Sequence, residues 1–130
     1  MRITHNEMPT IEAIISLYKD SGIIRPIDDF DRIKMMYNNS NLVVCAYEGD
    51  ELIGIGRSLT DFSYCCYLSD LAVSRKYQGK GIGKKIIDYI KNVITSKCTL
   101  LLLSSPSAMG FYEKINLDKS ENCFMKRREF

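Results

Sequence analysis

The stretch from Leu71 to Lys84 reads LAVSRKYQGKGIGK: an apolar strand end, a short basic linker, and alternating glycines that lead into an amphipathic helix. Because glycine has no Cβ, Gly79, Gly81 and Gly83 can adopt conformations that other residues avoid, and successive N–H groups can converge on one point. The first N–H groups of the helix lack a partner inside it, and the helix dipole adds about half a positive charge there. The stretch therefore predicts a site for a phosphate or pyrophosphate.

The spacing of the glycines separates three kinds of phosphate loop. A P-loop requires a glycine where Gln78 stands and a Ser or Thr where Lys85 stands. A dinucleotide fingerprint counted from Gly81 requires a glycine where Ile86 stands, and no carboxylate follows in Leu100 to Leu103. The third pattern, Gln or Arg, two residues, Gly, one residue, then Gly or Ala, fits residues 78–83.

With this third pattern the chain resembles the GNAT superfamily of N-acetyltransferases, whose signature loop carries the pyrophosphate of acetyl-coenzyme A. A second segment, Ala108 to Leu117, reads AMGFYEKINL and resembles a later motif of the same family, an Ala-x-x-Phe-Tyr helix that ends in a Gly-Phe turn. Asn116 and Leu117 stand where Gly-Phe is usual. Since Asn is the residue that best replaces Gly in the left-handed conformation, we expect the turn to form.

We expect one domain over residues 1–130 with an α+β fold. Its mixed, mostly antiparallel, twisted sheet of six to seven strands has helices on both faces, and a central pair of parallel strands is splayed at the cofactor cleft. Thr99 to Leu103 is a continuous apolar run, which suits a strand covered on both faces. The expected strands are Arg2–His5, Leu42–Tyr47, Leu52–Leu59, Tyr64–Val73, Thr99–Leu103 and Asn122–Lys126. The expected helices end at Ser21-Gly22, span about Asp28–Asn38, begin at Gly81, and begin at Ser105-Pro106.

The resemblance implies that acetyl-CoA is the co-substrate and is bound along the strand end, the glycine loop and the second motif. The cofactor-binding residues that it implies are Leu71, Ala72, Val73, Gln78, Gly79, Lys80, Gly81, Ile82, Gly83, Lys84, Ser104, Ala108 and Phe111. Independently of the resemblance, the residues of this strand could be ordinary core residues, and Phe111 packs into the core on either interpretation.

Acetyl transfer to an amine needs donors for the carbonyl oxygen, an acid for the departing sulfur and a base for the amine. Unpaired backbone N–H groups at residues 70–73 suit the oxygen. The resemblance makes Tyr112 the acid, since a phenol is protonated at neutral pH. Asp70 is the candidate base if burial raises its pKa. Alternatively Asp70 caps a backbone group, or water carries the proton away.

Composition narrows the function classes. Net charge is +2, from 18 basic and 16 acidic side chains, which gives no general attraction to nucleic acid. No stretch is apolar enough to cross a membrane, and the N-terminus does not resemble a signal peptide. Five cysteines without Cys-x-x-Cys spacing, and His5 as the only histidine, predict neither a disulfide framework nor a metal site. We therefore expect a cytoplasmic protein.

The predicted function is transfer of an acetyl group from acetyl-CoA to a primary amine of a small molecule or peptide, by direct attack in a ternary complex. The alternative is a non-catalytic module of the same fold that binds or senses acyl-CoA. A nucleotide-phosphate enzyme is disfavoured by the spacing. Asp28, Asp29 and Asp31 could attract a cationic amine, but acidic residues that open a helix also favour its dipole. A homodimer through the C-terminal strands is possible.

Overall fold

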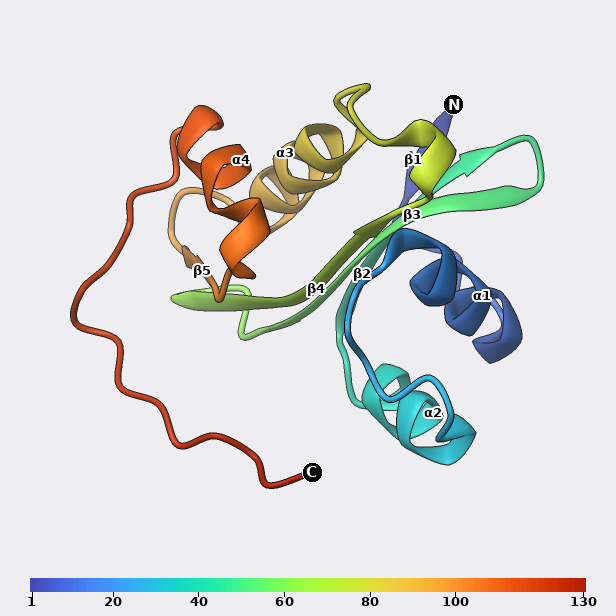
Figure 1. The fold of residues 1–130 in the computed structure, drawn as a ribbon. Coiled ribbons are helices and arrows are strands. Elements are labelled where there is room, and N and C mark those ends of the chain that lie inside the picture. The colour runs from blue at the N-terminus through green and yellow to red at the C-terminus, as the bar shows by residue number, and fades with distance from the viewer.

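In a computed structural model that describes residues 1–130, a single sheet has the strand order β1-β2-β3-β4-β5 (Figure 1). Neighbouring strands are antiparallel except β4 and β5, which are parallel as predicted. The strands are β1 (Arg2–Thr4), β2 (Leu42–Glu48), β3 (Glu51–Thr60), β4 (Cys65–Val73) and β5 (Thr99–Leu102). The helices are α1 (Ile11–Ser21), α2 (Phe30–Asn38), α3 (Ile82–Ile94) and α4 (Met109–Lys114), with 3-10 turns at Arg75–Tyr77 and Pro106–Ala108.

Helices cover both faces of the sheet, as the sequence predicts. α3 and α4 lie on one face, and α1 and α2 lie on the other (Figure 1). Each face has its own apolar core: Ile86 and Ile90 of α3 are fully buried on the first, and Ile14 and Ile33 are fully buried on the second. The result is an α+β fold with a mixed sheet. None of the helices has the length and hydropathy that a membrane crossing needs.

Two glycines of β3 let α3 lie very close to the sheet. A Cβ on Gly54 would lie 2.9 Å from Cδ1 of Ile86, and a Cβ on Gly56 would lie 2.8 Å from Cγ2 of the same side chain. Both distances are shorter than any real carbon contact. The glycines therefore fix the depth at which α3 sits, and with it the position of the glycine loop that opens this helix.

The sheet has five strands, and the prediction of six to seven is wrong. Residues 122–126, expected as a last strand, belong to a tail that leaves α4 and runs beside no other strand (Figure 1). Phe124 is 96% exposed. A strand needs a neighbour for its backbone groups and a face for its side chains, and this segment has neither. The tail reaches α2 instead, where Nη2 of Arg32 donates to the Phe130 carbonyl at 2.8 Å.

Because no further strand follows β5, the parallel pair lies at the edge of the sheet and not at its centre. The prediction that both faces of β5 are covered is also wrong. Leu100 and Leu102 pack under α3 and α4, whereas Leu101 and Leu103 are 46% and 47% exposed on the other face. α1 contacts β3 and β4 and lies away from β5 (Figure 1).

A bulge in β4 changes the face to which its side chains point. Arg57 pairs with Asp70 and Ser58 pairs with Leu68, so Ser69 is an extra residue in this strand. Leu68 belongs to the core under α3, whereas Ala72 belongs to the core under α1 and α2. Pairing of β4 with β5 ends at Leu68, so residues 69–73 have no strand on that side.

Candidate functional site

The glycine loop between β4 and α3 has the conformation that the sequence predicts. Gly79 and Gly81 have φ of +77° and +82°, in the left-handed region that residues with a Cβ avoid. Gly81 is also the residue that caps α3, and it supplies no side chain to the first turn of the helix. These two glycines therefore let the chain turn sharply while its amide groups stay accessible.

The amides of the loop are free. None of the backbone N–H groups of residues 79–84 donates a hydrogen bond within the protein; the next amide, that of Lys85, bonds the Gly81 carbonyl. The first turn of α3 contains no acidic residue and accepts no side-chain cap. Unpaired donors at the positive end of a helix of this length suit an anion such as a diphosphate.

Gln78 fixes this loop and does not belong to the set of free donors. Its backbone N–H donates to the Arg75 carbonyl at 3.2 Å. Its side-chain amide donates to the Val73 carbonyl at 2.9 Å and to the Ser21 carbonyl at 3.2 Å. The side chain therefore ties the loop to the end of β4 and to the end of α1.

The basic residues around the loop fall into two groups. Lys76 and Lys84 form ion pairs with Glu51 and Asp88, and the Arg75 side chain donates to the Asp20 carbonyl. Lys80 and Lys85 form no ion pair. The Lys80 ammonium lies 5.5 Å from the centre of the Tyr77 ring. Lys80 and Lys85 are thus the cations with charge left for phosphate oxygens.

The end of β4 presents unpaired backbone groups beside the loop. The Ser74 N–H donates to the Ile53 carbonyl of β3 at 2.7 Å. Since backbone groups alternate along a strand, the amides of Leu71 and Val73 face away from β3, toward the side where β5 has ended. The Val73 carbonyl, which accepts from Gln78, has this same orientation. Ala72, between them, packs into the α1 and α2 core.

The second motif lies against the start of α3. A Cβ on Gly83 would lie 3.2 Å from Cζ of Phe111 and 3.7 Å from Cδ2 of Leu71. Ala108 precedes α4, and the Ser104 hydroxyl, just after β5, donates to the Ser105 carbonyl at 2.7 Å. The structure therefore brings the strand end, the glycine loop and α4 together around one helix terminus.

Of the two turns that flank α4, the first differs from the sequence prediction and the second agrees with it. Ser105 caps the 3-10 turn Pro106–Ala108 without a side-chain hydrogen bond, so α4 begins later than predicted. Asn116 has φ of +66°, and the Leu117 N–H donates to the Tyr112 carbonyl at 3.1 Å. Asparagine thus takes the left-handed position usually held by glycine, which confirms that prediction.

Tyr112, the predicted acid, is half-buried and packs against the same core as Phe111. Burial raises the pKa of its hydroxyl, and the positive charge of Arg25 opposes that rise. The phenol is therefore protonated at neutral pH, the state required of a proton donor.

Asp70, the predicted base, is the centre of a buried ion-pair network. Its carboxylate oxygens accept from Nε of Arg25 and Nε of Arg57, each at 2.7 Å, and from the Tyr18 hydroxyl. The side chain is fully buried. Tyr37 extends the network through the Tyr18 hydroxyl.

The charge of this network reverses the pKa shift expected for Asp70. Burial by itself would raise the pKa, but the hydrogen bond and charge of Arg57, the Tyr18 hydroxyl and the charge of Arg25 hold it below its ordinary value. The net shift is therefore downward, opposite to the rise expected from burial. Asp70 is an ionised anchor for two arginines, without the basicity that made it a candidate base.

Sequence reasoning missed Arg25 and Arg57. Arg57 carried a signal, because it interrupts the apolar run of β3 and a buried arginine needs a carboxylate on a neighbouring element. Asp70 meets it as the cross-strand partner. Arg25 carried no comparable signal, since it lies in the loop between α1 and α2 and reaches Asp70 only through the tertiary fold.

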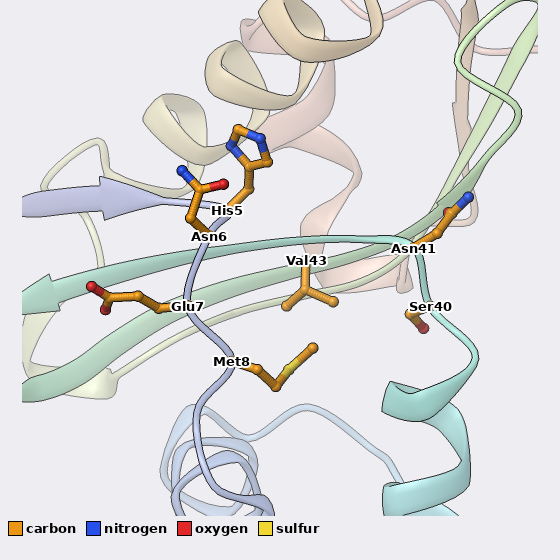
Figure 2. Close-up of a pocket in the computed structure, with 7 residues that line it drawn as sticks. All are labelled: His5, Asn6, Glu7, Met8, Ser40, Asn41 and Val43. Carbon is orange, nitrogen blue, oxygen red and sulfur yellow. The ribbon is translucent and has the colours of Figure 1, made fainter.

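Two cavities are lined by residues other than those of the predicted site. The first, of about 180 Å³, lies between the N-terminal segment and the start of β2 (Figure 2). It is lined by His5, Asn6, Glu7, Met8, Ser40, Asn41 and Val43. The second, of about 670 Å³, lies beside α1 and is lined in part by Asp20, Arg75 and Lys76. Neither contains a residue of the predicted site.

Two curated relatives match part of the chain. The uncharacterized ycf52-like N-acetyltransferase of Prochlorococcus marinus is 30% identical over 88 residues, 63% of this chain and 49% of that protein. The corresponding ycf52 protein of Pyropia yezoensis is 22% identical over 94 residues, 68% of this chain and 54% of that protein. The chain thus spans about half the length of the curated relatives it matches.

Solved structures match over almost the whole chain. SA2161 from meticillin-resistant Staphylococcus aureus, described as a probable acetyltransferase of unknown function, has a TM-score of 0.78 and 26% identity, and the match covers 97% of this chain and 98% of that one. An aminoglycoside 6'-N-acetyltransferase in complex with coenzyme A shares the fold with a TM-score of 0.70 and 16% identity, over 89% of this chain and 84% of that one.

A family model described as an acetyltransferase (GNAT) domain matches residues 22–126, from the loop after α1 to the tail beyond α4. The matched region contains the glycine loop, the end of β4 and the second motif, which the structure has assembled at one helix terminus. The chain therefore belongs to the GNAT superfamily of N-acetyltransferases, a family that transfers acyl groups from acetyl-CoA.

Proposed function

We propose that this protein transfers an acetyl group from acetyl-CoA to a primary amine of a small molecule or peptide, by direct attack in a ternary complex. The observation that carries the proposal is the set of free amides at residues 79–84, at an uncapped helix start without an acidic residue. A diphosphate is the part of coenzyme A that such donors fit. Lys80 and Lys85 supply nearby positive charge.

The strand end would hold the acyl arm. The outward amides of Leu71 and Val73 have the same spacing as the donors that pair one strand with the next. They therefore suit the amide carbonyls of an extended arm as well as the thioester oxygen. Gln78 already holds the Val73 carbonyl, so this end of β4 is positioned before any ligand arrives. Acetyl-CoA supplies the acetyl thioester when it is bound there.

The reaction needs one proton taken from nitrogen and one given to sulfur. The amine nitrogen forms the new bond to the acetyl carbon, the carbon–sulfur bond breaks, and the Tyr112 hydroxyl donates its proton to the departing thiolate. The proton lost by the amine passes to water, and Tyr112 regains a proton from solvent. Asp70 takes no part in this transfer, because its lowered pKa makes it a weak acceptor.

Location and assembly remain predictions. We propose a cytoplasmic location, which the cysteine pattern of the sequence predicts. A homodimer would require a partner for the open edge of β5.

Binding and turnover can be measured separately. Calorimetric titration with acetyl-CoA tests the loop, and mass spectrometry of products across a panel of amines tests transfer. Mass spectrometry is preferable to a free-thiol assay, because the protein's own cysteines would react. Tight binding with acetylated products supports the proposal. Binding without any product would favour the sensing module, and no binding would contradict the loop assignment itself.

A further inference from the structure

We infer that the acceptor amine carries an anionic group such as a carboxylate, held by Arg25, and an apolar body that rests on the uncovered face of β3, β4 and β5. This inference rests on the proposed function and names the acceptor class for the same site. Three observations carry it: an unbalanced charge, unused donors on Arg25, and an exposed apolar row next to them.

The charge of the network does not balance. Arg25 and Arg57 each contribute one positive charge, and Asp70 contributes one negative charge. No other carboxylate forms an ion pair with either arginine. One positive charge is therefore left without a counter-ion in a largely desolvated place, where an anion would gain most.

Arg25 is the arginine that a ligand can reach. Its side chain is 29% exposed, compared with 10% for Arg57. A guanidinium has five N–H donors. Nε donates to Asp70, Nη1 to the Ile24 carbonyl at 2.6 Å and Nη2 to the Ser69 carbonyl at 2.8 Å. One N–H on each terminal nitrogen remains unused, which suits the two oxygens of a carboxylate.

Arg25 also lies close to the reaction centre that we propose. It is bonded to Ser69, the bulge residue from which β4 continues without a parallel neighbour. Its positive charge also lowers the pKa of the Tyr112 hydroxyl, against the larger rise from burial. A short acceptor whose anionic group binds Arg25 would thus have its amine near the sulfur atom to which Tyr112 donates a proton.

An apolar row lies beside this arginine on the same face of the sheet. Tyr67 of β4 pairs with Leu59 of β3 on one side and Leu101 of β5 on the other. Leu59 and Leu101 are 42% and 46% exposed, and α1 and α2 lie away from β5 (Figure 1). Tyr67 precedes Ser69 by two residues. The row can therefore take the apolar part of a molecule whose anionic group binds Arg25.

Cationic acceptors are disfavoured by the same geometry. The second amine of a diamine would place its positive charge next to the guanidinium of Arg25, which has no counter-ion of its own. Two positive charges repel strongly where there is little water. An apolar amine without an anion would leave that guanidinium unpaired. The class that satisfies both the charge and the apolar row is an amine with an apolar body and a carboxylate.

Matched pairs of amines test this class. Isoamylamine and leucine share one apolar body, and benzylamine and para-aminomethylbenzoate share another; only the second member of each pair has a carboxylate. We expect kcat/KM for at least one pair to favour the carboxylate by about tenfold or more, as a charged hydrogen-bonded pair gives. We also expect para-toluate, which has no amine, to raise the melting temperature of the acetyl-CoA complex.

Variants of Arg25 test the residue. Arg25→Gln should bring the kcat/KM ratio within the preferred pair of amines to about one and abolish the melting-temperature shift caused by para-toluate. Arg25→Lys keeps the charge and should retain part of the ratio and part of the shift. Lys97→Gln is the matched control, since it also removes one positive charge, from an exposed side chain without a partner. The control should leave the ratio unchanged. Circular dichroism checks that each variant is folded.

The outcomes separate this inference from the proposed function. Equal kcat/KM values within both pairs, with acetyl-CoA bound and amines acetylated, would overturn the acceptor class and leave the acetyltransferase proposal intact. A ratio that survives Arg25→Gln would also overturn it. No binding of acetyl-CoA would overturn both. If no amine of the panel is acetylated, the melting-temperature shift caused by para-toluate becomes the deciding measurement. No shift, or a shift that Arg25→Gln leaves unchanged, would count against the inference.

Discussion

Gly83 and Phe111 touch, although 27 residues separate them: a Cβ on Gly83 would lie 3.2 Å from Cζ of the ring. The contact joins the first turn of α3, where the anion site lies, to α4, which carries Tyr112. The absence of a side chain at position 83 therefore sets the distance between the proposed phosphate site and the proposed acid.

Gly83→Ala should displace Phe111 by a few tenths of an ångström and move Tyr112 with it. Because small misplacements of reacting groups are costly, we expect kcat to fall about tenfold while acetyl-CoA still binds. Steady-state kinetics and calorimetry measure the two effects. Gly110→Ala in α4 is the control, since its Cβ meets nothing within 4 Å. Unchanged kcat in Gly83→Ala would show that the contact does not position Tyr112.

Gly81→Ala should weaken acetyl-CoA binding about tenfold or more. A Cβ at φ of +82° strains the turn and moves the amides that we assign to the diphosphate. Gly49→Ala in the β2–β3 turn, at φ of +59°, imposes a similar strain far from the loop. Each variant should lose about 1 kcal/mol of unfolding free energy. If both bind acetyl-CoA equally well, the loop is not the binding site.

Tyr112→Phe should lower kcat about a hundredfold and leave acetyl-CoA affinity nearly unchanged, because only the proton donor is lost. Tyr89→Phe, whose hydroxyl contacts His5, is the matched control. Since the pKa of Tyr112 is raised above its ordinary value of 10.0, kcat of the parent protein should show no decline from this group below that pH. A Tyr112→Phe variant as fast as the control would remove Tyr112 from the mechanism.

Asp70→Asn should destabilise the fold by about 3 to 5 kcal/mol, the usual cost of leaving buried charges without their partner. The pKa of Asp70 is lower in the folded state than its ordinary value of 3.8. Its ion pairs therefore stabilise the fold above that value, and this contribution is lost as pH falls through the folded pKa. Urea unfolding across acidic pH should show a shallower decline for the variant.

Asp118→Asn provides the comparison for that experiment, because Asp118 is exposed and forms no ion pair. It should match the parent protein in both stability and pH dependence. A small loss in Asp70→Asn, with the acid-side slope of the parent, would mean that the two arginines find other partners and that the network is not the anchor described here.

Local signals accounted for the parts of the fold that could be predicted. Gly79 and Gly81 predicted left-handed turns, Asn116 predicted the end of α4, and the isoleucines of α3 predicted its buried face. Each of these features depends on neighbours a few residues away. The family resemblance then supplied the order in which such pieces assemble.

The failures concern relationships that no local pattern encodes. Residues 122–126 have the apolar character of a strand, but strand formation depends on a partner that the chain does not place beside them. The pKa of Asp70 depends on Arg25, which lies 45 residues away, and on Arg57 across the sheet. The sequence predicted that Asp70 is buried but not that two arginines pair with it. These arginines determine the direction in which its pKa shifts.

Because Ser69 is an extra residue, even-numbered side chains of β4 face α3 before it and face α1 and α2 after it. Deleting Ser69 would make Leu68 and Asp70 consecutive, opposite Ser58 and Arg57, and each side chain would keep its present face. Deleting one residue from a regular part of the strand would instead turn the side chains on one side of the deletion to the wrong face, with Asp70 or the leucines among them. β4 can therefore be shortened by one residue at the bulge, and not within its regular parts, without mixing the two cores.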